Sequence, residues 1–299
     1  MKVGIAGTGR MGAAIAGRLM GLGHEVTVWN RTPEKTRALA AAGAHVAGTP
    51  SELADRVEIA ITILTDSVAI DATYAGTEGL LARDVRGKLF VEMSTVRPGT
   101  ETALAAKVRS KGAAMVDCPV GGSVGPAKEG KLLGFLGGEE ADVARARPVL
   151  EQLCRRVEHV GPVGAGARMK LAINLPLLVY WEAFAEALAL IAPLGLDPAR
   201  VVDILADTSG GPNVLKSRGT SLAAAMRGEE PAGVTVDVET MRKDLRTMLE
   251  EARAGGIALP VTARTLECYD EMVARGQGGR DITAFATRKF VPRLRGDDG

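Results

Sequence analysis

The start of the chain carries the pattern that most constrains its fold. A short apolar run, "KVGIAG", leads into Gly7-Thr8-Gly9-Arg10-Met11-Gly12, and a helical stretch follows from Met11 to Leu22. A G-x-G-x-x-G turn between a strand and a helix is typical of a βαβ unit that binds a dinucleotide. Gly7 permits the tight turn, Gly9 lets the backbone approach the pyrophosphate, and Gly12 lets the helix pack on the strand. We therefore predict that all six residues bind a cofactor, because the flanking strand and helix disfavour a glycine turn without a ligand.

The end of the second predicted strand bears on which dinucleotide binds. In a domain that binds NAD, an acidic residue at this place accepts hydrogen bonds from the ribose hydroxyls. This chain instead has Asn30, followed by Arg31 and Thr32. The missing carboxylate removes a repulsion from a 2′-phosphate, and the guanidinium offers it a planar fork of donors. The alternative is a solvated arginine that Glu34 partly neutralises, but the sequence favours NADP(H) over NAD(H).

Short strand-like segments alternate with helical stretches as far as about Val160. The strand candidates are "KVGIAG", "EVTVWN", "IAITIL", "LFVEMS", "AMVDCPV", "LLGFLGG" and "VEHVG". Strands separated by helices predict βαβ units and a parallel sheet. The Gly- and Pro-rich run "GPVGAG" at 161–166 ends this alternation. The predicted fold is therefore α/β, with a Rossmann domain over 1–162 and an all-α domain over 163–299, joined by a long helix.

The second half of the chain has helical periodicity. The joining helix is predicted from Ala167 to Leu194, which at 1.5 Å per residue spans roughly 42 Å. Pro176 lies inside it and is expected to kink it or to leave one carbonyl unpaired. Further helices are expected near 198–206, 238–254 and 261–275, and the polar tail from Arg293 to Gly299 is expected to fray.

Composition excludes several classes of protein. The 299 residues exceed the size at which one core usually stops growing, so two domains are expected. Lys and Arg total 37 against 36 Asp and Glu, without a block of like charges, which argues against a nucleic-acid or membrane-surface partner. The three widely spaced cysteines fit neither a disulfide framework nor a metal cluster. We expect a cytoplasmic protein without a metal. Its most apolar segment, 171–196, is interrupted by polar residues and by Pro176, so it suits a buried helix better than a bilayer span.

Several segments together resemble the β-hydroxyacid dehydrogenase family. This family includes 3-hydroxyisobutyrate dehydrogenase and belongs to the 6-phosphogluconate dehydrogenase superfamily. They are "GIAGTGRMG" at 4–12, "STVRP" at 94–98, "DCPVGGSVGPAKEG" at 117–130, "GAGARMKLAIN" at 164–174 and "KDL" at 243–245. The resemblance covers nearly the whole chain and implies a homodimer or homotetramer. It also implies NAD(P)-dependent oxidation of an alcohol or reduction of a carbonyl.

Carried over position by position, the resemblance makes Lys170 the catalytic residue. Hydride transfer to a carbonyl leaves an alkoxide, which needs a proton and a positive neighbour, and a lysine supplies both. We expect Lys170 in the first turn of the joining helix, with its ammonium facing the cleft between the domains. Asn174 lies four residues later on the same helix face, where it either orients the ammonium, binds a substrate oxygen, or makes a buried interhelix hydrogen bond.

The remaining cofactor contacts are expected at three places. The resemblance places Thr95 at the nicotinamide end and Lys243 near the cofactor and the active site, where its charge could lower the pKa of Lys170. Leu64, the last residue of the strand candidate "IAITIL", and Thr65, which follows it, are also assigned to the cofactor.

The predicted substrate loop departs from the family pattern. The family usually has D-x-P-V-S-G-G, whereas this chain has Gly121 at the serine position, followed by Gly122 and Ser123. We assign these three residues to substrate binding, since glycine amides can bind an anion and Ser123 could still supply a hydroxyl. Leu175 also replaces the second asparagine of the usual K-x-x-N-N. Both changes remove polar groups from the expected pocket.

The sequence thus predicts an NADP(H)-dependent dehydrogenase or reductase of a small β-hydroxy acid or semialdehyde, with Lys170 as general acid and base. An imine or other carbonyl reductase with a less polar substrate is the first alternative, although such imine reductases typically replace the lysine. A non-catalytic NADP-binding scaffold is the second alternative, which the retained lysine also disfavours.

Overall fold

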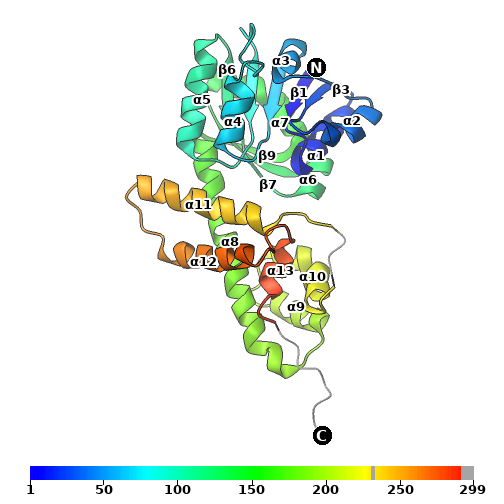
Figure 1. The fold of residues 1–299 in the computed structure, drawn as a ribbon, viewed down its shortest axis with the longest axis vertical. Helices are drawn as coiled ribbons and strands as arrows, with labels where there is room; N and C mark the ends of the chain where they lie inside the picture. The colour runs from blue at the N-terminus through cyan, green and yellow to red at the C-terminus, as the bar shows by residue number, and fades with distance from the viewer. Residues whose placement is uncertain (230–232, 291–299) are drawn as a thin grey trace. The chain divides into compact units, whose positions relative to one another are not determined.

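A computed structural model describes residues 1–229 and 233–290 of the chain, which divides into two compact units, Met1–Ile173 and Asn174–Gly299. The first unit is a sheet covered by helices, and the second is helical (Figure 1). This is the predicted fold class. The boundary at residue 162 stays a prediction; the division between the compact units lies later, inside the long helix.

The sheet of the first unit has the strand order β3-β2-β1-β4-β5-β6-β8-β7, with β9 paired to β8. The strands are β1 (Lys2–Ala6), β2 (Glu25–Trp29), β3 (His45–Val46), β4 (Ile59–Thr62), β5 (Leu89–Glu92), β6 (Ala114–Asp117), β7 (Val120–Gly121), β8 (Leu132–Gly137) and β9 (Cys154–Gly161). All pairs from β3 to β6 are parallel. The chain order reverses between β1 and β4, which in open parallel sheets is where a crevice for a ligand forms.

The prediction of a parallel sheet is wrong for β8. This strand runs antiparallel to β6 and β7, and only its pairing with β9 is parallel. The reason is local: β7 follows β6 almost at once, and the short helix α6 (Val124–Glu129) then reverses the chain. Strand β3 was not expected, because it is only two exposed residues long.

Helices cover both faces of the sheet, which explains why its central strands are continuously apolar. Helices α1 (Arg10–Gly21) and α7 (Glu140–Leu153) pack on the face that presents Ile5 and Val91. Helices α3 (Pro50–Arg56), α4 (Ser67–Ala75) and α5 (Pro98–Ser110) pack on the face that presents Phe90 and Met115. A short 3-10 turn (Pro33–Thr36) and α2 (Arg37–Ala41) link β2 to β3.

The long joining helix is confirmed as α8 (Ala165–Ile191), which is followed by a 3-10 turn (Ala192–Leu194). Pro176 lies inside α8 without ending it. The predicted helices near 198, 238 and 261 are confirmed as α9 (Pro198–Ala206), α11 (Val238–Ala254) and α12 (Pro260–Ala274). Helices α10 (Asn213–Met226) and α13 (Ile282–Thr287) were not predicted. Helix α10 packs on α9 and α13, and α11 packs on α12. The tail from Arg293, which was expected to fray, lies outside the described residues.

Among the described residues, Ala165–Leu194 is long and apolar enough to cross a membrane. Length and composition alone support this statement, and the core helix of a globular domain meets the same criterion. Only 39% of its most apolar stretch is buried, although Trp181 and Leu188 are fully buried.

Candidate active site

The glycine loop after β1 has the geometry of a pyrophosphate cradle. Gly7 has a φ of +99°, a conformation that favours glycine, and its amide donates to Trp29 O at 2.9 Å. A Cβ at Gly12 would overlap the carbonyl oxygen of Gly7, whereas a Cβ at Gly9 would meet nothing within 4 Å. Gly9 is the N-cap residue of α1 and, as a glycine, has no side chain that could cap the helix. The open space beside Gly9 leaves room for a pyrophosphate at the N-terminus of α1, which is where a helix favours an anion.

Asn30 fixes the loop after β2 to the glycine loop. Its Oδ1 accepts a hydrogen bond from the amide of Thr8 at 3.0 Å, and its Nδ2 donates to the carbonyl oxygen of Thr32 at 3.0 Å. The sequence pattern predicted Asn30 as a cofactor contact but did not show this bridging role.

Arg31 and Thr32 lie exposed beside this bridge. The acidic neighbour that could have neutralised the arginine, Glu34, lies 3.7 Å from Arg37 instead. Because both of those side chains are largely exposed, this pair contributes little to stability, but it directs the carboxylate toward Arg37.

A row of polar side chains crosses the carboxyl edge of the sheet. Thr62, Glu92 and Asp117 are register partners on β4, β5 and β6. Glu92 accepts hydrogen bonds from the Thr62 hydroxyl at 2.5 Å and from the Ser94 amide at 2.7 Å. The Ser94 hydroxyl in turn accepts from the Leu64 amide at 2.8 Å. Glu92 thereby fixes the two loops that carry the predicted cofactor residues, which are Leu64, Thr65 and Thr95.

The roles of Glu92 and Ser94 were not found from the sequence. The available signal was an acid at the end of the otherwise apolar strand "LFVE", since a buried carboxylate needs hydrogen-bond donors.

Three carboxyl groups are buried at this end of the sheet, namely those of Glu92, Glu101 and Asp117. Burial raises the pKa of Glu92 to about 7 and the pKa of Asp117 to about 6, although both accept backbone hydrogen bonds. Burial, together with the charges of the other two, raises the pKa of Glu101 well above its usual range. In the described part of the chain, neither oxygen of Glu101 has a hydrogen-bond partner.

These raised pKa values predict that stability falls as pH rises. Glu92 keeps its proton up to about pH 7 in the folded protein but loses it near 4.5 when unfolded. Between these pH values the folded state therefore binds more protons than the unfolded state. The free energy of unfolding falls as pH rises through that window, by about 3 kcal/mol for Glu92 alone. Urea unfolding from pH 4.5 to 8 measures this slope, which Glu92→Gln should flatten. An unchanged slope in Glu92→Gln, matching that of the exposed control Glu129→Gln, would contradict it.

Lys170 is half-buried on α8, but not where it was expected. The helix begins at Ala165, so Lys170 lies in its second turn rather than its first. The expectation was wrong because Gly166 was assigned to the preceding loop. A Cβ at Gly164 would lie 3.1 Å from the carbonyl oxygen of Pro98, so the start of α8 adjoins the "STVRP" segment that contains Thr95.

Asn174 and Lys243 both interact with one buried aspartate of the second unit. The Nδ2 of Asn174 lies 3.4 Å from Asp244 Oδ2, which is the interhelix hydrogen bond considered as an alternative for this residue. The ammonium of Lys243 forms an ion pair with Asp244 Oδ1 at 2.6 Å. The catalytic role of Asn174 and the cofactor contact of Lys243 remain predictions.

The predicted substrate loop has an apolar environment at its first residue. A Cβ at Gly121 would stand 3.6 Å from side-chain atoms of Ile173, Leu133 and Phe135, which is ordinary contact. Gly122 has a φ of +120°, so the backbone favours glycine there. Ser123 precedes α6 but makes no capping hydrogen bond to it. The structure therefore leaves space for a side chain at Gly121, and that space is lined by apolar groups.

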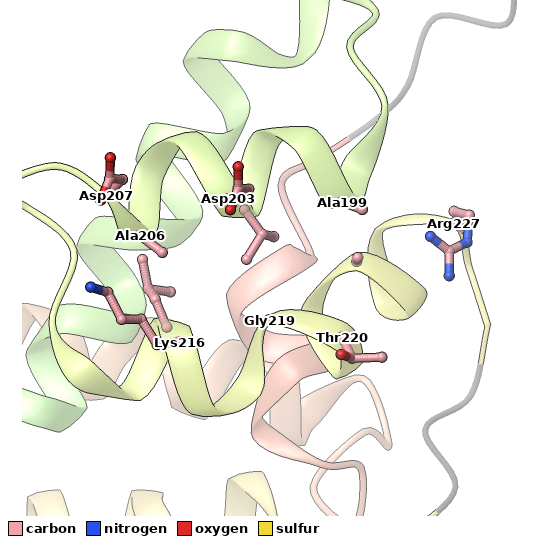
Figure 2. A pocket seen from close by; sticks show the side chains of 11 residues that line it. Ala199, Asp203, Ala206, Asp207, Lys216, Gly219, Thr220 and Arg227 are labelled. Carbon is pink, nitrogen blue, oxygen red and sulfur yellow. The ribbon is translucent and has the colours of Figure 1, made fainter.

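The second unit contains a cavity of about 710 Å³ between α9 and α10 (Figure 2). Its charged lining residues are Asp203, Asp207, Lys216 and Arg227. None of the predicted site residues lines it. Among the described residues, no group of three His, Cys, Asp or Glu side chains could hold a metal.

Two family models together match most of the chain. The model described as the NAD binding domain of 6-phosphogluconate dehydrogenase matches residues 2–161. The model described as NAD-binding of NADP-dependent 3-hydroxyisobutyrate dehydrogenase matches residues 164–288.

Similar proteins match over nearly the full length. The 3-hydroxyisobutyrate dehydrogenase of Pseudomonas aeruginosa is 33% identical over 87% of this chain and 88% of its own. Glyoxylate/succinic semialdehyde reductase 1 of Arabidopsis thaliana is 32% identical over 95% and 96%. The solved 3-hydroxyisobutyrate dehydrogenase of Mycobacterium tuberculosis with L-serine has a TM-score of 0.82 at 27% identity, covering 96% and 98%. An imine reductase of Myxococcus stipitatus, at a TM-score of 0.63 and 22% identity over 97% and 99%, shares the fold alone.

Proposed function

Because the chain belongs to the β-hydroxyacid dehydrogenase family, we propose that it is an NADP(H)-dependent oxidoreductase of a small β-hydroxy acid or semialdehyde. The observation that carries the proposal is the glycine cradle on α1, together with a lysine on α8 at the position of the family's catalytic residue. When bound, the nicotinamide supplies or accepts the hydride.

In this proposal, Lys170 handles the proton of the reacting oxygen. During reduction its ammonium donates a proton to the oxygen that becomes an alcohol, and during oxidation its neutral amine takes that proton back. The positive charge also stabilises the oxygen while it carries negative charge.

The direct test is oxidation of NADPH or NADH by the purified protein. The panel contains semialdehyde acids, 2-keto acids, uncharged aldehydes and cyclic imines. Turnover of the acids with NADPH supports the proposal, and turnover of imines alone contradicts it in favour of an imine reductase. NADPH binding without turnover of any compound would instead indicate a scaffold.

One observation favours the alternative of a less polar substrate. The position where the family pattern places a serine hydroxyl is Gly121, and the side chains closest to it are apolar. A carboxylate bound there would lose water without gaining that hydroxyl, which is unfavourable. Reduction of an uncharged carbonyl compound is therefore the second candidate function.

Gly121→Ser separates the two candidates. The new Cβ would be in ordinary contact with its neighbours, so we expect the variant to fold. A hydroxyl donor should raise kcat/KM for carboxylate substrates relative to uncharged aldehydes by about tenfold, as one hydrogen bond to a charged group would. Steady-state kinetics on matched aldehyde pairs measures this ratio. Gly125→Ser, where a Cβ meets nothing within 4 Å, is the control; equal ratios in both variants would show that residue 121 does not set selectivity.

We also propose that the protein is a cytoplasmic homodimer or homotetramer. The second unit exposes large apolar side chains, with Leu190 82% and Leu194 65% exposed, and a partner chain would cover such groups. The cysteines are free thiols, as a reducing compartment favours. Sedimentation analysis tests the assembly, and cell fractionation tests the compartment.

A further inference from the structure

The carboxylate of Asp117 connects the end of β6 to the start of α8. Its Oδ1 accepts a hydrogen bond from the amide of Gly164 at 2.7 Å, and its Oδ2 accepts one from the amide of Ala167 at 2.8 Å. The amide of Gly166 is a further donor to it. These amides have no partner within the helix, because the first turn of a helix leaves its N–H groups unpaired. A side chain about 50 residues earlier in the chain thus caps α8.

The surroundings of this carboxylate leave it little freedom to move. Asp117 is fully buried. A Cβ at Gly137 would overlap its Oδ1, and a Cβ at Gly166 would lie 2.9 Å from its Oδ2. Both glycines therefore allow backbone to close around the carboxylate, which fixes its place relative to β6 and β8.

We propose that Asp117 is a positioning residue for Lys170: by holding the first turn of α8, it fixes the distance of the lysine from the edge of the sheet. Lys170 lies three residues after Ala167, the last residue that the carboxylate holds. Helical hydrogen bonds then carry this position onward through the second turn. This inference rests on the proposed catalytic role of Lys170.

Two substitutions perturb the contact in different ways. Asp117→Asn keeps the shape of the side chain but removes one acceptor, so one amide of the first turn loses its partner. Gly137→Ala keeps the charge but places a Cβ that overlaps Asp117 Oδ1 and lies 2.8 Å from the carbonyl oxygen of Pro162, so it displaces the carboxylate and also presses on the segment that leads into α8. Glu101→Gln is the matched control, because it replaces another buried acid of the same region by its amide, and the oxygens of that acid make no hydrogen bond in the described part of the chain.

Kinetics separates positioning from a general structural effect. Because a shift of about 1 Å in a reacting group can cost roughly 100-fold in rate, we expect kcat to fall by about that factor in Asp117→Asn. Gly137→Ala should lower it as well, while the Kd for NADPH stays within about twofold in both. In the Lys170→Ala background, Asp117→Asn should cause no further loss, because the group that it positions is gone. A general structural defect would lower the residual rate again.

Hydrogen–deuterium exchange provides a readout that does not depend on activity. Amides 164–170 should exchange faster in Asp117→Asn and Gly137→Ala, but not in Glu101→Gln. Unchanged exchange, or wild-type kcat in either of the first two variants, would overturn the inference. If one variant does not fold, the other decides. If Lys170→Ala is fully active while exchange still rises, Asp117 holds α8 as described and the proposed function of Lys170 is what fails.

Discussion

Lys170→Ala is expected to lower kcat by roughly 10²- to 10⁴-fold, which is the usual contribution of a positioned general acid or base. The side chain is half-buried on a helix that Asp117 anchors at its first turn. The Kd for NADPH should change little. Stopped-flow reduction under single-turnover conditions measures the hydride step, and titration of NADPH fluorescence measures binding.

Two further variants sharpen this test. Lys170→Arg keeps a positive charge but cannot exchange its proton near neutral pH, so its rate should lie between those of the wild type and the alanine variant. Arg168→Ala removes an exposed cation two residues earlier on the same helix and serves as the control. A Lys170→Ala enzyme with a rate close to that of Arg168→Ala would remove Lys170 from the mechanism.

Much of the first unit could be predicted because its signals are local. A strand buried on both faces is continuously apolar, and the glycines of the first loop are required by the backbone itself, as the φ of Gly7 shows. The helices that begin at Pro198 and Val238 could also be placed closely, since Asp197 and Asp237 cap them with side-chain hydrogen bonds.

What could not be predicted depends on residues far apart in the sequence. Asp117 and Ala167 meet only because β6 and the start of α8 come together in the fold. Likewise, nothing near Asn30 in the sequence indicates that its side chain accepts from the amide of Thr8, since that contact requires β1 and β2 to be paired. Local patterns thus predicted the loops of the candidate site, whereas the contacts that hold those loops had to come from the structure.

Arg31→Asp is expected to change the cofactor preference by roughly 100-fold, measured as the ratio of kcat/KM with NADPH to that with NADH. In the proposed NADP(H) site, the substitution would remove a charge-assisted hydrogen bond to the 2′-phosphate, worth about 1.5 to 3 kcal/mol, and would add a repulsive carboxylate. The same carboxylate can accept hydrogen bonds from the ribose hydroxyls of NADH, so activity with NADH should rise or be retained. Because Arg31 is exposed and follows a loop that Asn30 holds in place, the fold should not change.

The control for this switch is Arg155→Asp, which makes the same charge change at another exposed position of the first unit, on β9. If long-range electrostatics alone set the preference, the two variants would shift the ratio alike, and raising salt would reduce both shifts. If Arg31 binds the 2′-phosphate directly, only Arg31→Asp shifts the ratio strongly. A ratio that stays at the wild-type value in Arg31→Asp would mean that this residue does not select the cofactor, and the preference for NADP(H) would then have to arise elsewhere in the site or be abandoned.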